Sequence, residues 1–346
     1  MPPSTVGFRS LSGAAGHPAD LGGTSARRLD ARVVSLIGLA VFIAASVIGV
    51  TSLGVPLSRE VISLWVLTGL LAVSLADMRG WARGVIFDWL PFIAALFAYD
   101  ALRGLVGNNP IFEPHVLPQI RFDEWLFGGL IPTVELQASF YDPERIAWWD
   151  VASWAIYLTH FFMVFVIAAV LWRLARPRFL EFRAMVLALA FSAFATYALF
   201  PAVPPWMASD DGFIGPVSRT IGGVWNYLGV KPAAAIFDRG SSFSNEVAAL
   251  PSLHTAYPVL ILCFFWSRGG WVRNLCLAYA VAMSVMLVYT GEHYVFDVIL
   301  GWIYAIVVFF AVKAIRGRLA RRRDRKESEA DLGEANPAFP DPVRQP

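Results

Sequence analysis

The sequence predicts an all-α protein, a polytopic membrane helix bundle with about eight transmembrane helices. Of its 346 residues, 57% are hydrophobic and only 16% are charged, whereas a soluble globular domain carries about 25% charged residues. Apolar runs of about 20 residues, the length that crosses about 30 Å of hydrocarbon, recur between residues 33 and 315. This composition excludes an ordinary soluble domain and makes lipid the expected solvent of the chain.

The chain divides into three parts. Residues 1–30 are rich in Pro, Gly, Ser and Ala and predict a disordered tail. Residues 31–316 hold the apolar runs, and residues 317–346 predict a basic and then polar disordered tail on the cytoplasmic side. The third predicted span is the weakest, because Asp88 and Pro91 interrupt it. We expect spans at about 33–55, 60–77, 84–102, 147–172, 184–203, 253–267, 273–290 and 294–315.

Basic residues orient the predicted bundle. They gather at 79–83, 173–183, 268–273 and 313–326. With eight spans, all of these segments lie on one side, and the positive-inside rule makes that side cytoplasmic, together with both termini. We expect an integral protein of the plasma membrane, with the long connections 103–146 and 204–252 on the extracytoplasmic side. Loops of this length are more often functional than idle, which predicts lids or substrate walls.

Two histidines fall at equivalent places in this topology. His254 stands where the second long connection enters the sixth span, and His293 stands where the chain enters the eighth. Both therefore lie at the same extracytoplasmic face. Asp297 follows His293 by one helical turn, so their side chains share one face. Its carboxylate can accept the imidazole Nδ1 proton, which leaves Nε2 free as a base or a nucleophile.

Helix starts at these positions favour a phosphate ligand. The N-terminus of a helix presents unpaired N–H groups and a partial positive charge. Ser252 suits such a start and could cap the helix or donate its hydroxyl to a phosphoryl oxygen. A histidine near a membrane interface also serves as an anchor, and a His–Asp pair also occurs as a structural hydrogen bond. Two histidines and an aspartate on one face favour phosphate chemistry over these alternatives.

These residues resemble the phosphatidic acid phosphatase type 2 superfamily. Pro-Ser-Leu-His at 251–254 is similar to its second motif, PSGH, and His-Tyr-Val-Phe-Asp at 293–297 is similar to the end of its third, SRxxxxxHxxxD. The resemblance implies a catalytic transmembrane domain with a six-helix phosphatase-like core. It makes His293 the nucleophile on phosphorus, Asp297 its orienting residue and His254 the general acid. A phosphohistidine intermediate would then pass to water or to an alcohol.

Departures from the family motifs point to one branch. The first motif, KxxxxxxRP, is absent; Met286-Leu287 replaces the Ser-Arg pair of the third motif, and Leu253 replaces the Gly of the second. The sequence in this respect resembles the inositol phosphorylceramide synthase group, over about residues 85–315. Further segments similar to that group are Tyr99–Gly104, Asp123–Gly128, Tyr157–Phe161, Phe200-Pro201 and Pro204–Trp206.

The missing basic motif leaves phosphate binding to other residues. Arg103, Arg121 and Arg239 lie on the predicted outer side, and Arg103 is the foremost candidate, although each can also be a solvated loop arginine. An arginine fork binds phosphate oxygens bidentately. Asp123 could hold such an arginine, contact a polar head group or cap a loop. His160 lies mid-span and either lines the substrate cavity or forms a core hydrogen bond.

We therefore expect a membrane enzyme, a phosphotransferase that moves a phosphoryl head group, with inositol phosphate as one candidate, between lipids. The alternative is a lipid-phosphate or polyprenyl-phosphate phosphatase. A transporter or scaffold is a further class, but the ionisable residues gather at one face instead of forming a chain across the bilayer. A 2-His-1-carboxylate metal site is also open, although no HExxH motif occurs. We expect lipids as donor and acceptor, and no cofactor, metal or nucleic acid.

Overall fold

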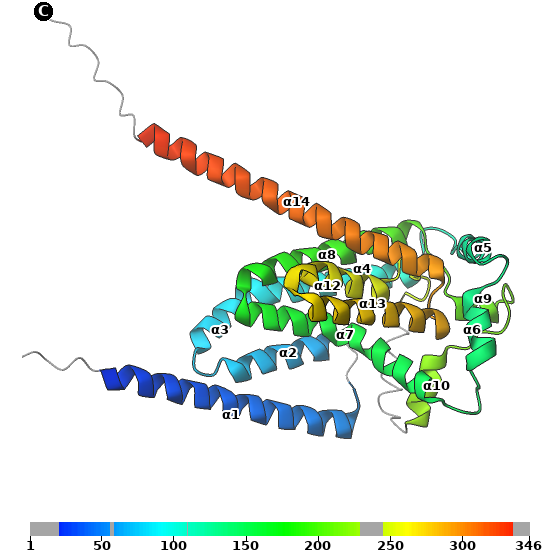
Figure 1. The fold of residues 1–346 in the computed structure, drawn as a ribbon, viewed down its shortest axis with the longest axis horizontal. Coiled ribbons are helices and arrows are strands. Elements are labelled where there is room, and N and C mark those ends of the chain that lie inside the picture. The colour runs from blue at the N-terminus through cyan, green and yellow to red at the C-terminus, as the bar shows by residue number, and fades with distance from the viewer. Residues whose placement is uncertain (1–20, 56–58, 109, 229–244, 335–346) are drawn as a thin grey trace, which may run out of the picture.

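The computed structural model describes residues 21–55, 59–108, 110–228 and 245–334, which form a helix bundle without a regular strand (Figure 1). This confirms the predicted all-α polytopic membrane fold. Among these residues, six helical segments are long and apolar enough to cross a membrane, so the protein is an integral membrane protein. They are Val33–Ser52, Met78–Gly107, Trp148–Leu174, Arg176–Leu199, Gly270–Tyr289 and Val295–Ser328.

Each of the eight apolar runs of the sequence is helical. The corresponding helices are α1 (Leu21–Leu53), α2 (Arg59–Val73), α3 (Met78–Gly84) with α4 (Leu90–Asn108), α7 (Trp148–Leu174), α8 (Arg176–Leu199), α12 (Leu253–Phe265), α13 (Gly270–Tyr289) and α14 (Val295–Glu334). Two of them, α2 and α12, have only 15 and 13 residues, which at 1.5 Å per residue is about 20 Å of helix. They account for the difference between eight predicted spans and six full-length ones.

Four short helices come from the two long connections. They are α5 (Leu117–Leu126), α6 (Pro132–Phe140), α9 (Pro205–Asp210) and α10 (Thr220–Tyr227). All four lie at one end of the bundle, opposite the end that carries α3 (Figure 1). Backbone pairing joins the two connections there, because Ala202 pairs with both His115 and Ala248. These helices cover the end of the bundle at which α12 and α14 begin.

Both ends of the described chain are more helical than predicted. Helix α1 begins at Leu21, inside the predicted tail 1–30, and α14 continues to Glu334, well into the predicted tail 317–346. The C-terminal extension is rich in Ala, Arg, Lys and Glu, which are strong helix formers. Arg323 and Glu327 also form an ion pair of 2.8 Å one turn apart. A charged composition therefore supports helix here without apolar packing.

Close packing brings the starts of α12 and α14 together. Helix α12 packs against both α13 and α14. Gly301, one turn after Asp297, lies so close to the Ser252 carbonyl and the Thr255 hydroxyl that a Cβ atom would meet both. Small residues allow membrane helices this close approach. The position of Gly301 thus fixes the distance between the two helices that carry the predicted catalytic residues.

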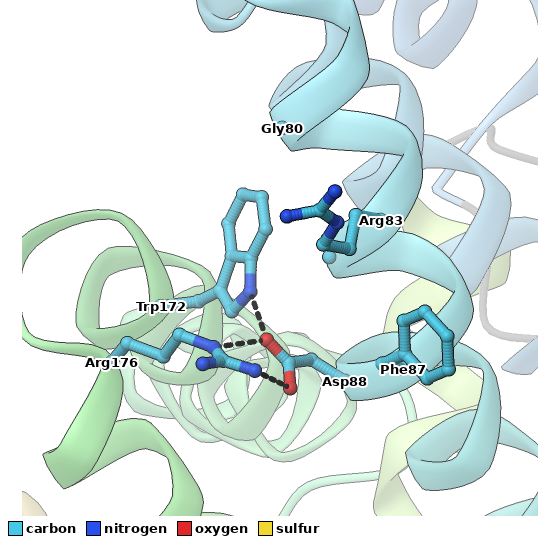
Figure 2. Close-up of a pocket in the computed structure, with 7 residues that line it drawn as sticks. Gly80, Arg83, Phe87, Asp88, Trp172 and Arg176 are labelled. Atoms are coloured by element: carbon cyan, nitrogen blue, oxygen red, sulfur yellow. Dashed lines mark hydrogen bonds and ion pairs between the residues drawn. The ribbon is translucent and has the colours of Figure 1, made fainter.

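The third predicted span is helical even though Asp88 interrupts its apolar sequence, because Asp88 has specific hydrogen-bond partners. Helix α3 passes into α4 through a π-helical turn, Val85–Trp89, and the chain stays helical. The buried Asp88 carboxylate accepts hydrogen bonds from Arg176, at 2.6 and 2.8 Å, and from the Trp172 indole at 2.9 Å (Figure 2). A cavity of about 340 Å³ lies beside these residues. An intramembrane carboxylate is costly unless it is paired, and here it is paired.

Replacing Asp88 by alanine should lower the free energy of unfolding by about 1–3 kcal/mol, because the Trp172 indole loses its acceptor. The catalytic activity that the sequence predicts, measured per folded molecule, should not change, since this cavity lies at the end that carries α3. Thermal unfolding in detergent, together with turnover, measures both effects. The exposed Arg79 provides a control, because Arg79→Ala should leave the midpoint unchanged. Equal midpoints for Asp88→Ala and wild type would contradict this role.

Candidate active site

Helix α12 begins at the end of the bundle that α5, α6, α9 and α10 cover, and His254 is its second residue. Ser252 is fully buried and caps the helix, since its Oγ accepts the N–H of Thr255 at 3.4 Å. The Ser252 N–H in turn donates to the carbonyl oxygen of Asp297 at 3.1 Å. Two roles were predicted for the Ser252 hydroxyl, a helix cap and a donor to phosphate. The hydrogen bond from Thr255 shows the cap.

The start of α14 presents His293 beside Asp297. Asp297 is fully buried, and its Oδ2 lies 3.3 Å from Nδ1 of His293. The same oxygen accepts the N–H of Tyr294 at 3.0 Å. This carboxylate thus caps the helix and orients the imidazole in one arrangement. The one-turn spacing in the sequence predicted this geometry, which directs Nε2 of His293 away from Asp297.

The two predicted catalytic histidines meet between α12 and α14. Nε2 of His293 lies 3.5 Å from Nδ1 of His254, and the ring centroids are 5.6 Å apart. A single phosphoryl group can contact both rings, because reacting atoms approach to about 3–3.5 Å. The other nitrogen of His254, Nε2, is buried and has no hydrogen-bond partner in the described structure. No three His, Cys, Asp or Glu side chains of the described residues are grouped to hold a metal.

Helix α7 adds two side chains to this group. The ring of His160 lies 4.0 Å from that of His254, and the Tyr157 ring stacks on His254 at 5.0 Å. Nδ1 of His160 is buried without a hydrogen-bond partner among the described residues. The structure therefore places His160 beside His254, one of the two predicted catalytic histidines. Tyr157 begins the segment Tyr157–Phe161 that resembles the synthase group, but it was not predicted as a site residue.

An ion pair next to His293 was also missed by the sequence analysis. Arg219 donates to the Glu292 carboxylate at 2.8 and 3.3 Å, and its guanidinium lies 5.3 Å from the centre of the Trp206 ring. Glu292 precedes His293 directly, which was a local signal for its relevance. Arg219 comes from the second long connection, 73 residues away, and nothing near it in the sequence indicated this contact.

The three arginines considered for phosphate binding lie in different settings. Arg103 lies on α4 with its guanidinium 5.9 Å from the centre of the Tyr99 ring, and its Nε is buried without a partner in the described structure. Arg121 is exposed on α5. Arg239 lies outside the described residues. Of the three, Arg103 is thus the one that the structure partly buries in the bundle.

Asp123 binds backbone groups of α14. Its two carboxylate oxygens accept the N–H groups of Val295 and Phe296, each at 3.0 Å. Burial raises the pKa of Asp123 to about 6, against the opposing effect of these two donors, and the charge of Asp297 raises it further. Asp123 therefore caps the helix that carries Asp297, the predicted orienting residue. No arginine among the described residues pairs with Asp123, although holding an arginine was one of the roles considered from the sequence.

The raised pKa of Asp123 predicts a pH-dependent stability. Between about pH 4, the ordinary carboxyl value, and about pH 6, the folded protein holds a proton that the unfolded chain releases. Its contribution to stability is therefore fully present below about pH 4 and is lost as the pH rises through 6. At about 1.4 kcal/mol per pKa unit, the loss is about 3 kcal/mol.

Asp123→Asn removes this titration. As the pH rises from 4.5 to 7.5, the unfolding midpoint of wild type should therefore fall relative to the midpoint of the variant. Glu124→Gln is the matched control, because Glu124 is its neighbour on α5 and is not buried. Thermal unfolding at several pH values measures the difference. Parallel curves for wild type and Asp123→Asn would contradict the raised pKa.

The fold and this group of side chains define a membrane enzyme that acts on lipid phosphates, as a phosphatase or a phosphotransferase. The family model of the PAP2 superfamily matches residues 120–311, more than half of the chain. The chain belongs to the PAP2 superfamily. This confirms the family predicted from the two histidine motifs, and the matched segment contains His160, His254, His293 and Asp297.

One curated protein supports the predicted branch of the superfamily. The chain is 28% identical to the phosphoinositol dihydroceramide synthase of Bacteroides thetaiotaomicron over 232 residues, which cover 61% of this chain and 71% of that protein. No solved structure matches the chain. The similarity agrees with the branch indicated by the altered motifs.

Proposed function

We propose that this enzyme transfers a phosphoryl head group from a donor phospholipid to the hydroxyl of an acceptor lipid. The observation that carries the proposal is the meeting of three side chains, with His293 lying 3.3 Å from Asp297 and 3.5 Å from His254. The similarity to a phosphoinositol dihydroceramide synthase supports transfer. It also makes inositol phosphate the first head group to test and a ceramide-type lipid the first acceptor.

In the proposed first step, Nε2 of His293 attacks phosphorus and the bond between phosphorus and the diacylglycerol oxygen breaks. Asp297 accepts a hydrogen bond from Nδ1–H and stabilises the positive charge that develops on the imidazole. His254 donates a proton to the leaving oxygen. The products of this step are diacylglycerol and a phosphohistidine that carries the head group.

In the proposed second step, the now neutral His254 takes the proton of the acceptor hydroxyl. The acceptor oxygen attacks phosphorus, the bond between phosphorus and nitrogen breaks, and His293 is restored. Water in place of the lipid hydroxyl would give hydrolysis, which is the phosphatase alternative. The two activities share the first step and differ only in which hydroxyl reaches the phosphohistidine.

Charge placement supports an orientation for this chemistry. Arg79, Arg83, Arg173 and Arg176 belong to the end that carries α3, whereas the histidines lie at the opposite end. By the positive-inside rule, we place both termini in the cytoplasm and the active site at the extracytoplasmic face of the plasma membrane. An impermeant reagent that labels a C-terminal tag on intact cells would contradict this orientation.

A product assay tests the proposed function. Purified full-length enzyme in lipid nanodiscs is given phosphatidylinositol labelled in the inositol together with dihydroceramide. The label should appear on dihydroceramide, with one diacylglycerol released for each transfer, and His293→Ala should give neither product. Release of free inositol phosphate alone would replace the transferase by a phosphatase. Equal product from wild type and His293→Ala would exclude this active site.

A further inference from the structure

The cavity beside Asp88 lies at the opposite end of the bundle from the histidines. It has a volume of about 340 Å³ and is lined by residues of four helical segments. Arg83 lines it from α3, Asp88 from the π-helical turn, Trp172 from α7 and Arg176 from α8 (Figure 2). The proposed reaction makes no use of these residues, so their arrangement calls for an explanation of its own.

The charges around this cavity do not balance. Of the described residues that line it, Asp88 is the one with a carboxylate, and Arg176 contacts both of its oxygens, at 2.6 and 2.8 Å. Arg183 donates to the backbone carbonyl of Asp88 at 2.8 Å. Neither Arg83 nor Arg183 forms an ion pair with a described residue. Two permanent arginine charges therefore lack a counter-charge in the described structure, which favours an anionic ligand.

The position of the cavity along the bundle is that of phospholipid head groups. Three membrane-spanning segments have an end beside it, namely Met78–Gly107, Trp148–Leu174 and Arg176–Leu199. Phe87 lines the same cavity one turn further into its span than Arg83, and 67% of its surface is exposed. The arginines thus border the polar layer of the membrane, whereas Phe87 borders the hydrocarbon.

We propose that this cavity binds the phosphate of an anionic phospholipid between Arg83 and Arg176. Arg176 donates to Asp88 through Nε and Nη2, which leaves Nη1 for the phosphate. Arg83 offers its whole guanidinium group, whose fork suits phosphate oxygens. A free phosphate ion presents the same oxygens, but only a lipid also covers the exposed ring of Phe87. Basic pockets between membrane helices recognise anionic head groups in this way.

Lipid binding to the purified full-length protein tests this site. Protein in uncharged detergent is titrated with dioctanoyl phosphatidylglycerol, which is anionic, or with dioctanoyl phosphatidylcholine, which is zwitterionic. The thermal unfolding midpoint reports binding, because a ligand of the folded state raises it. Phosphatidylglycerol should raise the midpoint at lower concentration than phosphatidylcholine. Arg83→Gln should weaken the binding of phosphatidylglycerol about tenfold, the effect of losing hydrogen bonds to a charged group.

Arg79→Gln is the matched control. Arg79 is an exposed arginine of the same helix, α3, and does not line the cavity. Its replacement removes the same charge, so this variant should bind phosphatidylglycerol like wild type. Arg83 is also exposed, so Arg83→Gln removes no buried packing and should fold. The effect of Arg83→Gln should persist in a His293→Ala background, since the histidines lie at the other end of the bundle.

Three results would overturn the lipid site. Equal affinities of wild type and Arg83→Gln would remove Arg83 from it. Equal losses in Arg83→Gln and Arg79→Gln would show attraction to this basic end as a whole. An equal rise of the midpoint with inorganic phosphate at the same concentration would show a site for free anions. None of these measurements uses turnover, so the lipid site and the proposed function can fail separately.

Discussion

His293→Ala is expected to abolish turnover, with a loss on the order of 10⁵-fold or more. Asp297 contacts Nδ1 of His293, so Nε2, which faces His254, is the nitrogen that is oriented to attack phosphorus. Steady-state turnover with labelled phosphatidylinositol measures the loss. The variant should also release no diacylglycerol in the first turnover, because the first step itself is lost.

The control for this variant is its folded state. His293 is almost fully buried, so its replacement leaves a small cavity, and Oδ2 of Asp297 keeps only the hydrogen bond from the N–H of Tyr294. His115→Ala is a matched comparison, since His115 stacks on Phe200 at 3.8 Å and has no contact with the catalytic pair. That variant should keep its activity when folded. A folded His293→Ala protein with wild-type turnover would contradict the assigned nucleophile.

His254→Ala is expected to reduce turnover about 100-fold to 10,000-fold, the usual contribution of a general acid. Its effect should depend on the leaving group. A diacylglycerol alkoxide needs a proton as it leaves, whereas a nitrophenolate is stable without one. The loss should therefore be much smaller with a nitrophenyl phosphodiester as donor. Paired measurements with the two donors test the role directly.

The outcome for His293→Ala with the same two donors provides the contrast. A missing nucleophile is not restored by a better leaving group, so that variant should stay inactive with both donors. Equal losses for His254→Ala with both donors would show that His254 acts in some other way, such as positioning the phosphate. Full activity with the natural donor would remove it from the mechanism.

Local spacing explains why part of the site could be predicted from the sequence. His293 and Asp297 are four residues apart, and one helical turn brings them together whatever surrounds the helix. Predicting the position of His254 also required the topology, because an even number of spans must separate it from His293 for both to lie at the same face. The apolar runs supplied that number, even though α2 and α12 are shorter than a full span.

Contacts between distant segments could not be predicted in this way. Arg219 meets Glu292 across 73 residues, and Asp123 meets Val295 across 172. No periodicity records such pairs, since they depend on how the long connections fold over the helix starts. The helical ends of α1 and α14 were missed for another reason: charged sequences with strong helix formers resemble disordered tails in composition.

The covalent intermediate offers the most direct test of the central claim. Enzyme is mixed with phosphatidylinositol labelled in the phosphate, quenched at alkaline pH within the first turnover and digested. The label should lie on the peptide that contains His293 and should be released by acid, as expected of a bond between phosphorus and nitrogen. It should be absent from His293→Ala. Label on another residue, or none from an enzyme that turns over, would contradict the mechanism.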